Sequence, residues 1–467
     1  MRKALVGCDF GNGLKCGLRH RFIVPVDPQL LRRCYETADF EPLRAAYAPQ
    51  ALFDAFIPGR RVRLSGGDAI VAQLASWWSS PGKLLRWSTD EFPSGLTIEF
   101  EREVDGGRVW RQRQFLQYAD GKIVRQQVYS ARPQSAAGAP PESVLAEQLL
   151  AEVGEVVSIE PLVHAGQAGG WIERATLADG RSVVVKRVVA ERDLLGRLSG
   201  GESRESLLWE SGAFAKLPGW IDTAILAAGS DHGETVLVMR DVSDALLGVA
   251  GALTRAQSAR LLEALAAIHR SFAGETYDFL CPLRSFLTLI SPQRLELVAD
   301  DVDYIPKVIA VGWEVFAEHA PAEVVDVVFG VHADPEPLAL ALESCGTGIA
   351  HGDYRCANLG LDGERVIVLD WGIAAQAPGV VDLAWYVFVN GWRIEAAKED
   401  LIVDYRAAAG DLYDERAIGL GLAAGLAWFG GLLSHELIES DAAKRERARR
   451  ELDWWCARTR EAAERWL

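Results

Sequence analysis

The stretch that decides the fold is HGDYRCANLGLDGERVIVLDW, residues 351–371. Its β-branched run, residues 365–369, follows an Asp-Gly turn and therefore predicts the buried second strand of a hairpin. Such a strand presents Asp370 at its carboxyl end. Asp353 and Asn358 lie five residues apart in the preceding loop. The sequence thus predicts that three oxygen-bearing side chains gather around one short hairpin.

The chemistry of these side chains suits phosphoryl transfer. Carboxylate and amide oxygens are hard donors of the kind that Mg²⁺ prefers, so Asn358 and Asp370 are the expected metal ligands. The loop can direct Asp353 toward a substrate hydroxyl, where it would accept or orient the proton. His351 is expected to anchor the loop through hydrogen bonds, because a buried loop histidine is usually structural.

The order of these residues also carries a resemblance. His-Gly-Asp, four residues, Asn, and then Asp-Trp-Gly at 370–372 is similar to the signature of aminoglycoside phosphotransferases and their choline-kinase relatives. It parallels the H-R-D-x-x-x-x-N and D-F-G elements of protein kinases. The resemblance covers residues 145–467. It implies a bilobal protein-kinase-like fold, with a β-rich N-lobe at 145–242 and a helical C-lobe at 243–467 that carries the catalytic loop.

The resemblance implies a phosphate-binding lysine upstream of the hairpin. Lys186 ends SVVVK on an expected strand, where it would pair with the α- and β-phosphates of ATP. Glu205 follows nineteen residues later in an expected helix, residues 202–217, and would orient that lysine. Glu202 and Glu210 are the alternatives for this role.

Further cofactor contacts are implied by the same resemblance. The segment VLVMRDV is similar to a kinase hinge, so backbone groups near Met239 and Asp241 would meet adenine. Gly166 and Gly169 stand where a phosphate loop is expected, although no G-x-G-x-x-G occurs there. Asp382, in GVVDLAWYV, would brace the catalytic loop without touching substrate.

A separate unit precedes the kinase-like part. The segment SARPQSAAGAPPES, residues 130–143, has the composition of a linker. We assign the linker between the two units to residues 133–144. Upstream of it, apolar spacing predicts helices and then alternating strands, which together make an α+β layer arrangement. The expected helical segments are 27–48 and 67–80, and the expected strands are 95–105, 108–120 and 122–131.

This order is similar to the cone-shaped fold of nuclear transport factor 2 and the polyketide-cyclase-like proteins, over residues 25–132 of an expected domain at 1–132. The resemblance implies a curved antiparallel sheet and a possible homodimer. Four tryptophans can line a pocket, but their helix and strand spacing favours core packing. They are Trp77, Trp78, Trp87 and Trp110.

The composition of the chain limits the classes of partner and the compartment that are expected. The net charge of −16 disfavours nucleic acid. Residues 1–133 hold 20 Lys and Arg against 14 Asp and Glu, whereas the remainder holds 29 against 51, a step that suggests two units. No run of eighteen consecutive apolar residues occurs, so no membrane span or signal peptide is expected. Seven scattered cysteines without a C-x-x-C pair favour a reducing cytoplasm.

The sequence therefore predicts an ATP- and Mg²⁺-dependent phosphotransferase that phosphorylates a hydroxyl of a small molecule. The resemblance implies aminoglycoside-, macrolide- or choline-like acceptors, and the acidic second part favours a cationic one. The alternative is a non-catalytic nucleotide-binding or regulatory module, with the cone as ligand sensor or dimerisation domain. A weaker third possibility makes the cone a cyclase or isomerase, but no acid–base pair stands out in it.

Overall fold

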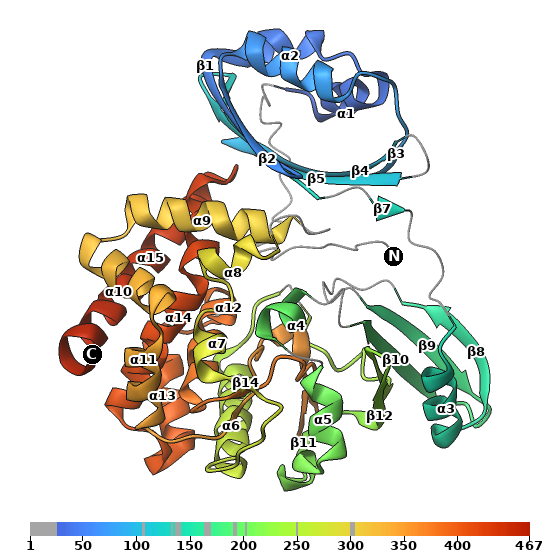
Figure 1. Ribbon diagram of the computed structural model, residues 1–467, viewed down its shortest axis with the longest axis vertical. Coiled ribbons are helices and arrows are strands. Elements are labelled where there is room, and N and C mark those ends of the chain that lie inside the picture. Colours follow the sequence, from blue (N-terminus) through green and yellow to red (C-terminus); the bar gives the residue numbers. More distant parts are fainter. Residues whose placement is uncertain are drawn as a thin grey trace.

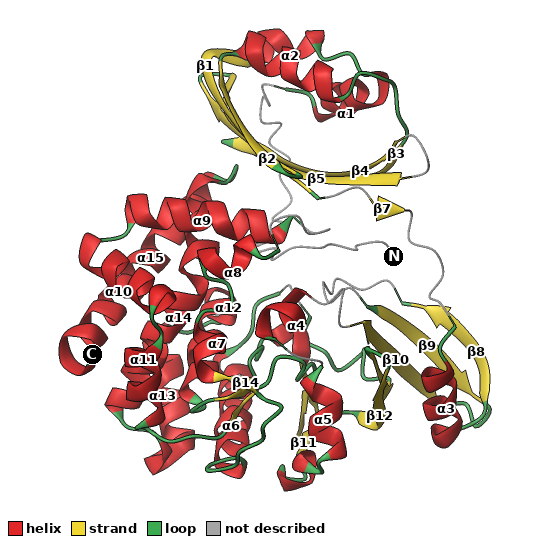
Figure 2. Cartoon of the chain, in the orientation of Figure 1, coloured by secondary structure: helices red, strands yellow, loops and turns green. Residues whose placement is uncertain are grey.

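The computed structural model describes residues 26–104, 108–131, 134–135, 142–162, 170–189, 194–200, 203–248, 251–298 and 304–467. These residues form a cone, a small β-rich lobe and a large helical lobe (Figure 1). Strands are concentrated in the first two parts and helices in the third (Figure 2). The fold is α+β, with a bilobal protein-kinase-like pair of lobes preceded by a cone-shaped domain, as the sequence predicts.

The cone is a curved sheet with two helices over its concave face (Figure 1). The strand order is β2-β1-β6-β5-β4-β3, with β7 paired to β5. Neighbouring strands are antiparallel, as predicted, apart from β1 and β6, which run parallel. Its elements are α1 (Pro28–Thr37), η1 (Glu41–Ala46), β1 (Tyr47–Ile57), β2 (Arg60–Ser65), α2 (Gly67–Trp77), β3 (Leu84–Phe92), β4 (Gly95–Val104), β5 (Arg108–Ala119), β6 (Lys122–Ser130) and β7 (Gln134–Ser135).

Three of the six long strands of the cone follow the prediction. Strands β4, β5 and β6 lie at the alternating segments, whereas β1, β2 and β3 were not predicted. The expected helix at 27–48 divides into α1 and a 3-10 turn, and its end belongs to β1. Part of the expected linker is a short strand instead, because β7 pairs with β5.

The interior of the cone is packed with aromatic and glutamine side chains. The ring of Tyr35 lies 5.8 Å from that of Trp78 and 6.1 Å from that of Trp87. Gln114 Nε2 donates to the Tyr35 hydroxyl at 2.7 Å, and Gln126 Nε2 donates to Gln114 Oε1 at 3.0 Å. Trp78 is 5 % exposed, and the remaining two tryptophans of the pattern, Trp77 and Trp110, are partly buried against the same core. The tryptophans therefore serve core packing, as their spacing favours.

The small lobe is an antiparallel sheet in the order β12-β13-β10-β9-β8. Helix α3 packs on one face of it, and α5 contacts β12. The expected helix at 202–217 is in fact α5 followed by a 3-10 turn. The elements of this lobe are α3 (Val144–Val153), β8 (Val156–Pro161), β9 (Trp171–Leu177), β10 (Ser182–Val189), α4 (Leu194–Ser199), α5 (Arg204–Glu210), η2 (Ala213–Lys216), β11 (Ile221–Asp222), β12 (Ile225–Asp231) and β13 (Glu234–Arg240).

The helical lobe carries the predicted hairpin as β16 and β17, which pair from Leu359 opposite Val368 to Asp362 opposite Arg365. Strand β17 also pairs with β11 from the small-lobe segment, so it is the central and buried strand of a three-stranded sheet. The elements are α6 (Arg255–Ser271), β14 (Cys281–Pro282), α7 (Leu283–Leu287), α8 (Pro292–Glu296), α9 (Ile305–His319), α10 (Ala322–Ala333), α11 (Glu336–Glu343), β15 (Ile349–Ala350), η3 (Cys356–Asn358), β16 (Leu359–Asp362), β17 (Arg365–Val368), β18 (Ala375–Gln376), α12 (Val380–Asn390), η4 (Gly391–Arg393), α13 (Lys398–Ala409), η5 (Gly410–Leu412), α14 (Glu415–His435), η6 (Glu436–Ile438) and α15 (Ala442–Trp466).

Helix α14 is the core of this lobe and contacts α9, α12 and α15. With the following turn it is long and apolar enough to cross a membrane, but 89 % of its most apolar window is buried inside the protein. Helix α14 is therefore a core helix of this lobe. It crosses α9 closely, since a Cβ atom on Gly312 would lie 1.7 Å from the carbonyl oxygen of Gly431. Only glycine permits this approach.

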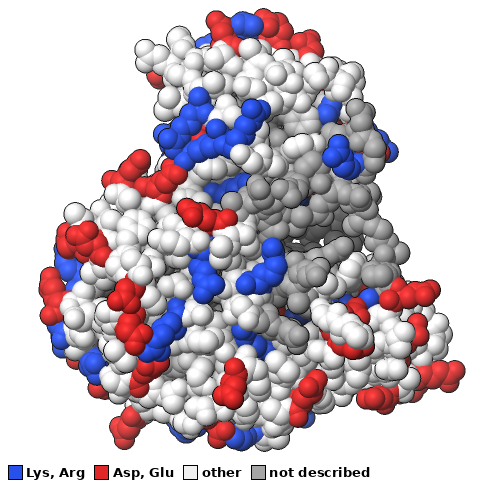
Figure 3. Space-filling view, viewed as in Figure 1, with Lys and Arg blue, Asp and Glu red and all other residues white. Residues whose placement is uncertain are grey.

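The outer face of the cone sheet packs against the end of the helical lobe. The buried His435, at the end of α14, lies with its Nε2 2.7 Å from the Tyr129 hydroxyl of β6. Figure 3 shows Lys and Arg side chains gathered on the cone beside acidic side chains of the lobe, and Arg63 donates to Glu314 of α9 at 3.1 Å. Three further hydrogen bonds end on backbone carbonyls: Gln117 Nε2 to Ile438 at 2.6 Å, Ser94 Oγ to Ser440 at 2.6 Å, and Lys307 Nζ to Ser130 at 3.1 Å.

Candidate active site

Three charged side chains from separate elements meet between the small and helical lobes. Lys186, on β10, donates from Nζ to Glu205 Oε2 at 3.1 Å and to Asp370 Oδ1 at 2.7 Å. Glu205, on α5, is completely buried, and its other oxygen accepts the backbone N–H of Asp370 at 3.0 Å. The structure thus places Glu205 beside the lysine. Of the alternatives, Glu210 is the exposed last residue of α5, and Glu202 lies outside the described residues.

Electrostatics keep this cluster charged. Burial on its own lowers the pKa of Lys186, but Asp370 and Glu205 outweigh burial and raise that pKa above its usual range. Burial also raises the pKa of Asp370, but the adjacent Lys186 more than compensates and holds the pKa below its usual value. Asp370 adopts a φ of +68°, which is strained for a residue with a side chain and is typical of functional sites. A fixed cation at this position suits an anionic ligand such as a phosphate.

The loop that carries the proposed base is fixed to the strand behind it. His351 Nε2 lies 3.0 Å from the carbonyl oxygen of Leu369, and its Nδ1 accepts the backbone N–H of Asp353 at 3.1 Å. These partners require a neutral ring with its proton on Nε2, and burial lowers the pKa of His351 accordingly. Gly352 has a φ of +84°, and a Cβ there would lie 2.5 Å from the Ile373 carbonyl oxygen. The histidine therefore anchors the loop and the glycine permits its turn.

Asp353 itself is buried among groups that tune its basicity. It is 6 % exposed, and its Oδ2 accepts from Asn358 Nδ2 at 2.9 Å and lies 3.1 Å from Arg355 Nε. Burial raises the pKa of Asp353 to about 6, even though Arg355 lowers it. At neutral pH this carboxylate is ionised and is a stronger base than an ordinary aspartate, as proton transfer from an alcohol requires.

The first turn of α12 braces the same loop. Asp382 is completely buried, and its two oxygens accept the backbone N–H groups of His351 at 2.6 Å and Gly352 at 2.8 Å. His269, from α6, lies with its Nε2 3.2 Å from Asp382 Oδ2. Asp382 therefore holds the backbone of the catalytic loop in place from behind and is itself held by a core histidine.

The donors next to Asp353 fit a hard divalent cation. Asn358 uses its Nδ2 to donate to the backbone carbonyl and the side chain of Asp353, which leaves its amide oxygen as a ligand. Asp370 uses Oδ1 toward Lys186, so its second carboxylate oxygen is the one offered to a metal. Within the described ranges there is no cluster of three or more His, Cys, Asp or Glu able to hold a metal. A pair of oxygen ligands completed by phosphates and water is the usual arrangement for Mg²⁺.

The expected adenine-binding edge is partly described. Met239 lies in β13 and is 8 % exposed. The side chain of Asp241 is occupied within the small lobe, because its Oδ2 accepts from Arg174 Nε at 2.7 Å. The backbone N–H of Asp241 likewise donates within this lobe, to the carbonyl oxygen of Ser182 at 3.3 Å, so the adenine-binding role of Met239 and Asp241 stays a prediction. Gly166 and Gly169, the expected phosphate-loop glycines, lie outside the described residues.

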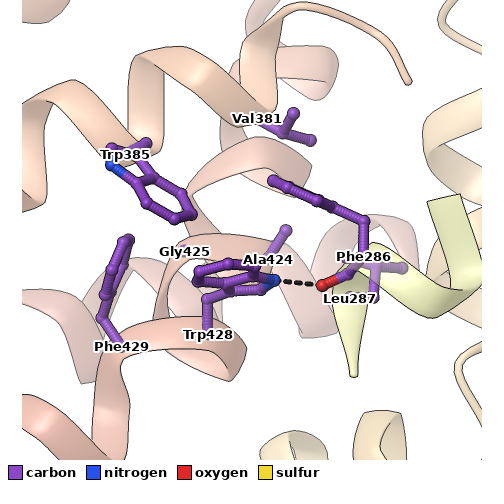
Figure 4. A pocket seen from close by; sticks show the side chains of 8 residues that line it. All are labelled: Phe286, Leu287, Val381, Trp385, Ala424, Gly425, Trp428 and Phe429. Atoms are coloured by element: carbon purple, nitrogen blue, oxygen red, sulfur yellow. Dashed lines mark hydrogen bonds between the residues drawn. The ribbon is translucent and has the colours of Figure 1, made fainter. Parts of the chain in front are cut away.

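A small aromatic pocket lies beside the base, between α7, α12 and α14 (Figure 4). The indole N–H of Trp385 is near the Asp353 carboxylate and helps to lower the pKa of that carboxyl. This buried N–H does not form a hydrogen bond of normal geometry. In Figure 4 the indole nitrogen points away from the other rings. Trp385 thus separates the base from an apolar interior. The pocket is lined by Phe286, Leu287, Val381, Trp385, Ala424, Gly425, Trp428 and Phe429.

Three residues near the base were not predicted. Arg355 stands two residues after Asp353 within the quoted stretch, so its position was visible, but its contact was not. Trp385 and Asn390 lie on α12, and Asn390 Oδ1 accepts the backbone N–H of Cys356 in the loop at 2.9 Å. The GVVDLAWYV match to Asp382 located this helix, and a residue one turn further along it faces the same loop.

Comparisons with known proteins identify a family for part of this chain. The model of the phosphotransferase enzyme family matches residues 177–418. Among curated proteins, none matches this sequence. Three solved structures are similar. Choline kinase LicA from Streptococcus pneumoniae is 13 % identical, with 67 % of this chain and 98 % of that chain covered and a TM-score of 0.41. A microcompartment-associated aminopropanol kinase is 15 % identical, with 68 % and 97 % covered and a TM-score of 0.42. An aminoglycoside phosphotransferase from Streptomyces rimosus, in complex with ADP and streptomycin, is 18 % identical, with 60 % and 97 % covered and a TM-score of 0.38.

Proposed function

Because this chain belongs to the phosphotransferase enzyme family, we propose that it transfers the γ-phosphate of ATP to a hydroxyl group of a small molecule. The observation that carries the proposal is the position of Asp353. It is a buried carboxylate with a pKa of about 6, on the loop that also holds Asn358 and is tied to the strand before Asp370. A base, two metal ligands and a phosphate-binding lysine thus belong to one site.

Each side chain has a proposed part in the transfer. Asp353 accepts the proton of the acceptor hydroxyl as its oxygen attacks the γ-phosphorus. Lys186 exchanges its ion pair with Asp370 for the α- and β-phosphates, while Glu205 keeps it oriented. Asn358 and Asp370 would hold Mg²⁺, which neutralises phosphate charge when bound.

The acceptor is proposed by class. The names of the similar structures include choline, aminopropanol and aminoglycoside kinases, which act on small amino alcohols or sugars. We propose a small alcohol for this chain too, and the acidic balance of residues 134–467 favours a cationic one. The cone is proposed to share the nuclear transport factor 2-like fold and to support a homodimer. The free thiols of the described cysteines suit a reducing cytoplasm.

A panel of amino alcohols, aminoglycosides and macrolides, incubated with Mg²⁺-ATP, tests the proposal. ADP release and mass analysis of the acceptor should show a phosphorylated product with the unaltered protein and none with Asp353→Ala. Asp362→Ala, in the exposed turn of the same hairpin, is the matched control and should retain activity. Nucleotide binding without any phosphate transfer, to acceptor or water, would favour the regulatory module instead.

A further inference from the structure

One cation in the site has no part in the transfer described so far. Arg355 lies between the base and Asn358 in the sequence, and its Nε is 3.1 Å from Asp353 Oδ2. Its side chain is 40 % exposed, whereas that of Asp353 is 8 % exposed. The guanidinium therefore covers the base from the open side of the loop.

The charge of Arg355 reaches both ends of the site. The guanidinium pairs with Asp353 and also interacts electrostatically with Asp370, which stands on the neighbouring strand end. Its charge therefore acts on both carboxylates of the site. In an in-line transfer the phosphoryl group passes through this region, because the acceptor oxygen is at the base and the β-phosphate is at the metal.

The loop has other anchors besides this arginine. Asp353 Oδ2 already accepts from Asn358 Nδ2 at 2.9 Å, and the loop backbone is fixed by His351 and Asp382. The ion pair joins a partly exposed guanidinium to a buried carboxylate. It also weakens the base, since Arg355 opposes the rise in the pKa of Asp353. A compensating gain is expected in the transition state, where negative charge spreads over the three equatorial phosphoryl oxygens.

We propose that Arg355 is a catalytic residue whose guanidinium binds the phosphoryl group in transit, an inference that rests on the proposed function. The acceptor oxygen forms a bond to the γ-phosphorus, and the bond from that phosphorus to the bridging oxygen breaks, with its electron pair leaving on ADP. The acceptor proton moves to Asp353. Arg355 exchanges no atom, but its planar fork of N–H donors pairs with two phosphoryl oxygens at once.

A transition-state analogue tests this without knowledge of the acceptor. Titration calorimetry would compare Mg²⁺-ADP with Mg²⁺-ADP plus aluminium fluoride, which mimics the phosphoryl group in flight, on the full chain. In Arg355→Gln, the affinity for Mg²⁺-ADP should stay within about twofold, while the tightening caused by fluoride should fall about 100-fold, below the range known for arginines in this role. Arg355→Lys should recover part of the tightening.

Arg365→Gln is the matched control, because Arg365 belongs to the same hairpin and lies 3.7 Å from Asp222, away from the base. It should behave as the unaltered protein does. Full tightening by fluoride in Arg355→Gln would overturn the inference, and so would an equal loss of Mg²⁺-ADP binding, since that marks a ground-state contact. Absence of Mg²⁺-ADP binding in the unaltered protein would instead refute the proposed function.

Discussion

Replacement of Asp353 by asparagine should abolish transfer and at the same time stabilise the protein at neutral pH. The amide has nearly the shape of the carboxyl, and its oxygen can still accept from Asn358 Nδ2 and Arg355. It carries no charge, however, and cannot take a proton from the acceptor. Turnover should fall by about 10²–10⁴-fold, the usual contribution of a positioned base.

The stability change follows from the pKa of the buried carboxyl. Folding raises it from 3.8 to about 6, so the folded state favours the protonated form. The resulting stability is fully present below pH 3.8 and is lost as the pH rises through 6. The whole loss corresponds to about 3 kcal/mol at 1.36 kcal/mol per pKa unit, and about 1.5 kcal/mol of it falls between pH 5 and pH 7.5. The Asp353→Asn variant has no titrating group at this position, so its free energy of unfolding does not fall with pH for this reason.

Urea unfolding without nucleotide, at pH 5 and pH 7.5, measures the effect. The free energy of unfolding of Asp353→Asn minus that of the unaltered protein should be more positive at pH 7.5 by about 1.5 kcal/mol. Asp362→Asn, which changes an exposed aspartate of the hairpin turn, is the control. A difference that stays constant or shrinks with rising pH would refute the reasoning, because it would mean that the carboxylate is not penalised by burial.

Three other substitutions address separate parts of the structure. Lys186→Ala should reduce ATP turnover by about 10²-fold or more, with weaker nucleotide binding in calorimetry, because it removes the fixed cation for the phosphates. Asp382→Asn should lower kcat with little change in KM for ATP and should cost about 1.5–3 kcal/mol in chemical unfolding, since backbone donors lose a charged acceptor. Gly312→Ala should destabilise the helical lobe by about 1–3 kcal/mol or more in the same assay, because of the Gly431 carbonyl. Gly330→Ala, on an open face of α10, should be neutral or slightly stabilising.

The catalytic hairpin was predictable because its signals are local. An Asp-Gly turn, a β-branched strand and a five-residue spacing fix where Asp353, Asn358 and Asp370 stand. Lys186 and Glu205 were reachable through the order of elements, and the structure brings them together at 3.1 Å. These features depend on neighbouring residues or on a motif, so the sequence alone contains them.

Features that depend on tertiary packing were not predictable. Strand β1 (Tyr47–Ile57) has Pro49 and a second exposed residue near its start, and its burial alternates only after a bulge, so only its first two residues were assigned, to the end of a helix. Its parallel pairing with β6 joins segments about seventy residues apart. The approach of Trp385 to Asp353 depends on how α12 packs behind the loop. A buried pKa likewise reflects the whole surroundings of the carboxyl and not its sequence neighbours.

Part of the joint between the cone and the helical lobe is made through main-chain acceptors, namely the carbonyls of Ile438, Ser440 and Ser130. Every amino acid supplies such a carbonyl, so these hydrogen bonds depend on the position of the backbone and not on the side chain of the accepting residue. These acceptors stay in place when the residues that carry them change, although the buried hydroxyl of Ser440 also donates to the Leu96 carbonyl. We therefore expect distant homologues to preserve the same domain arrangement even where little sequence similarity is left at the contact.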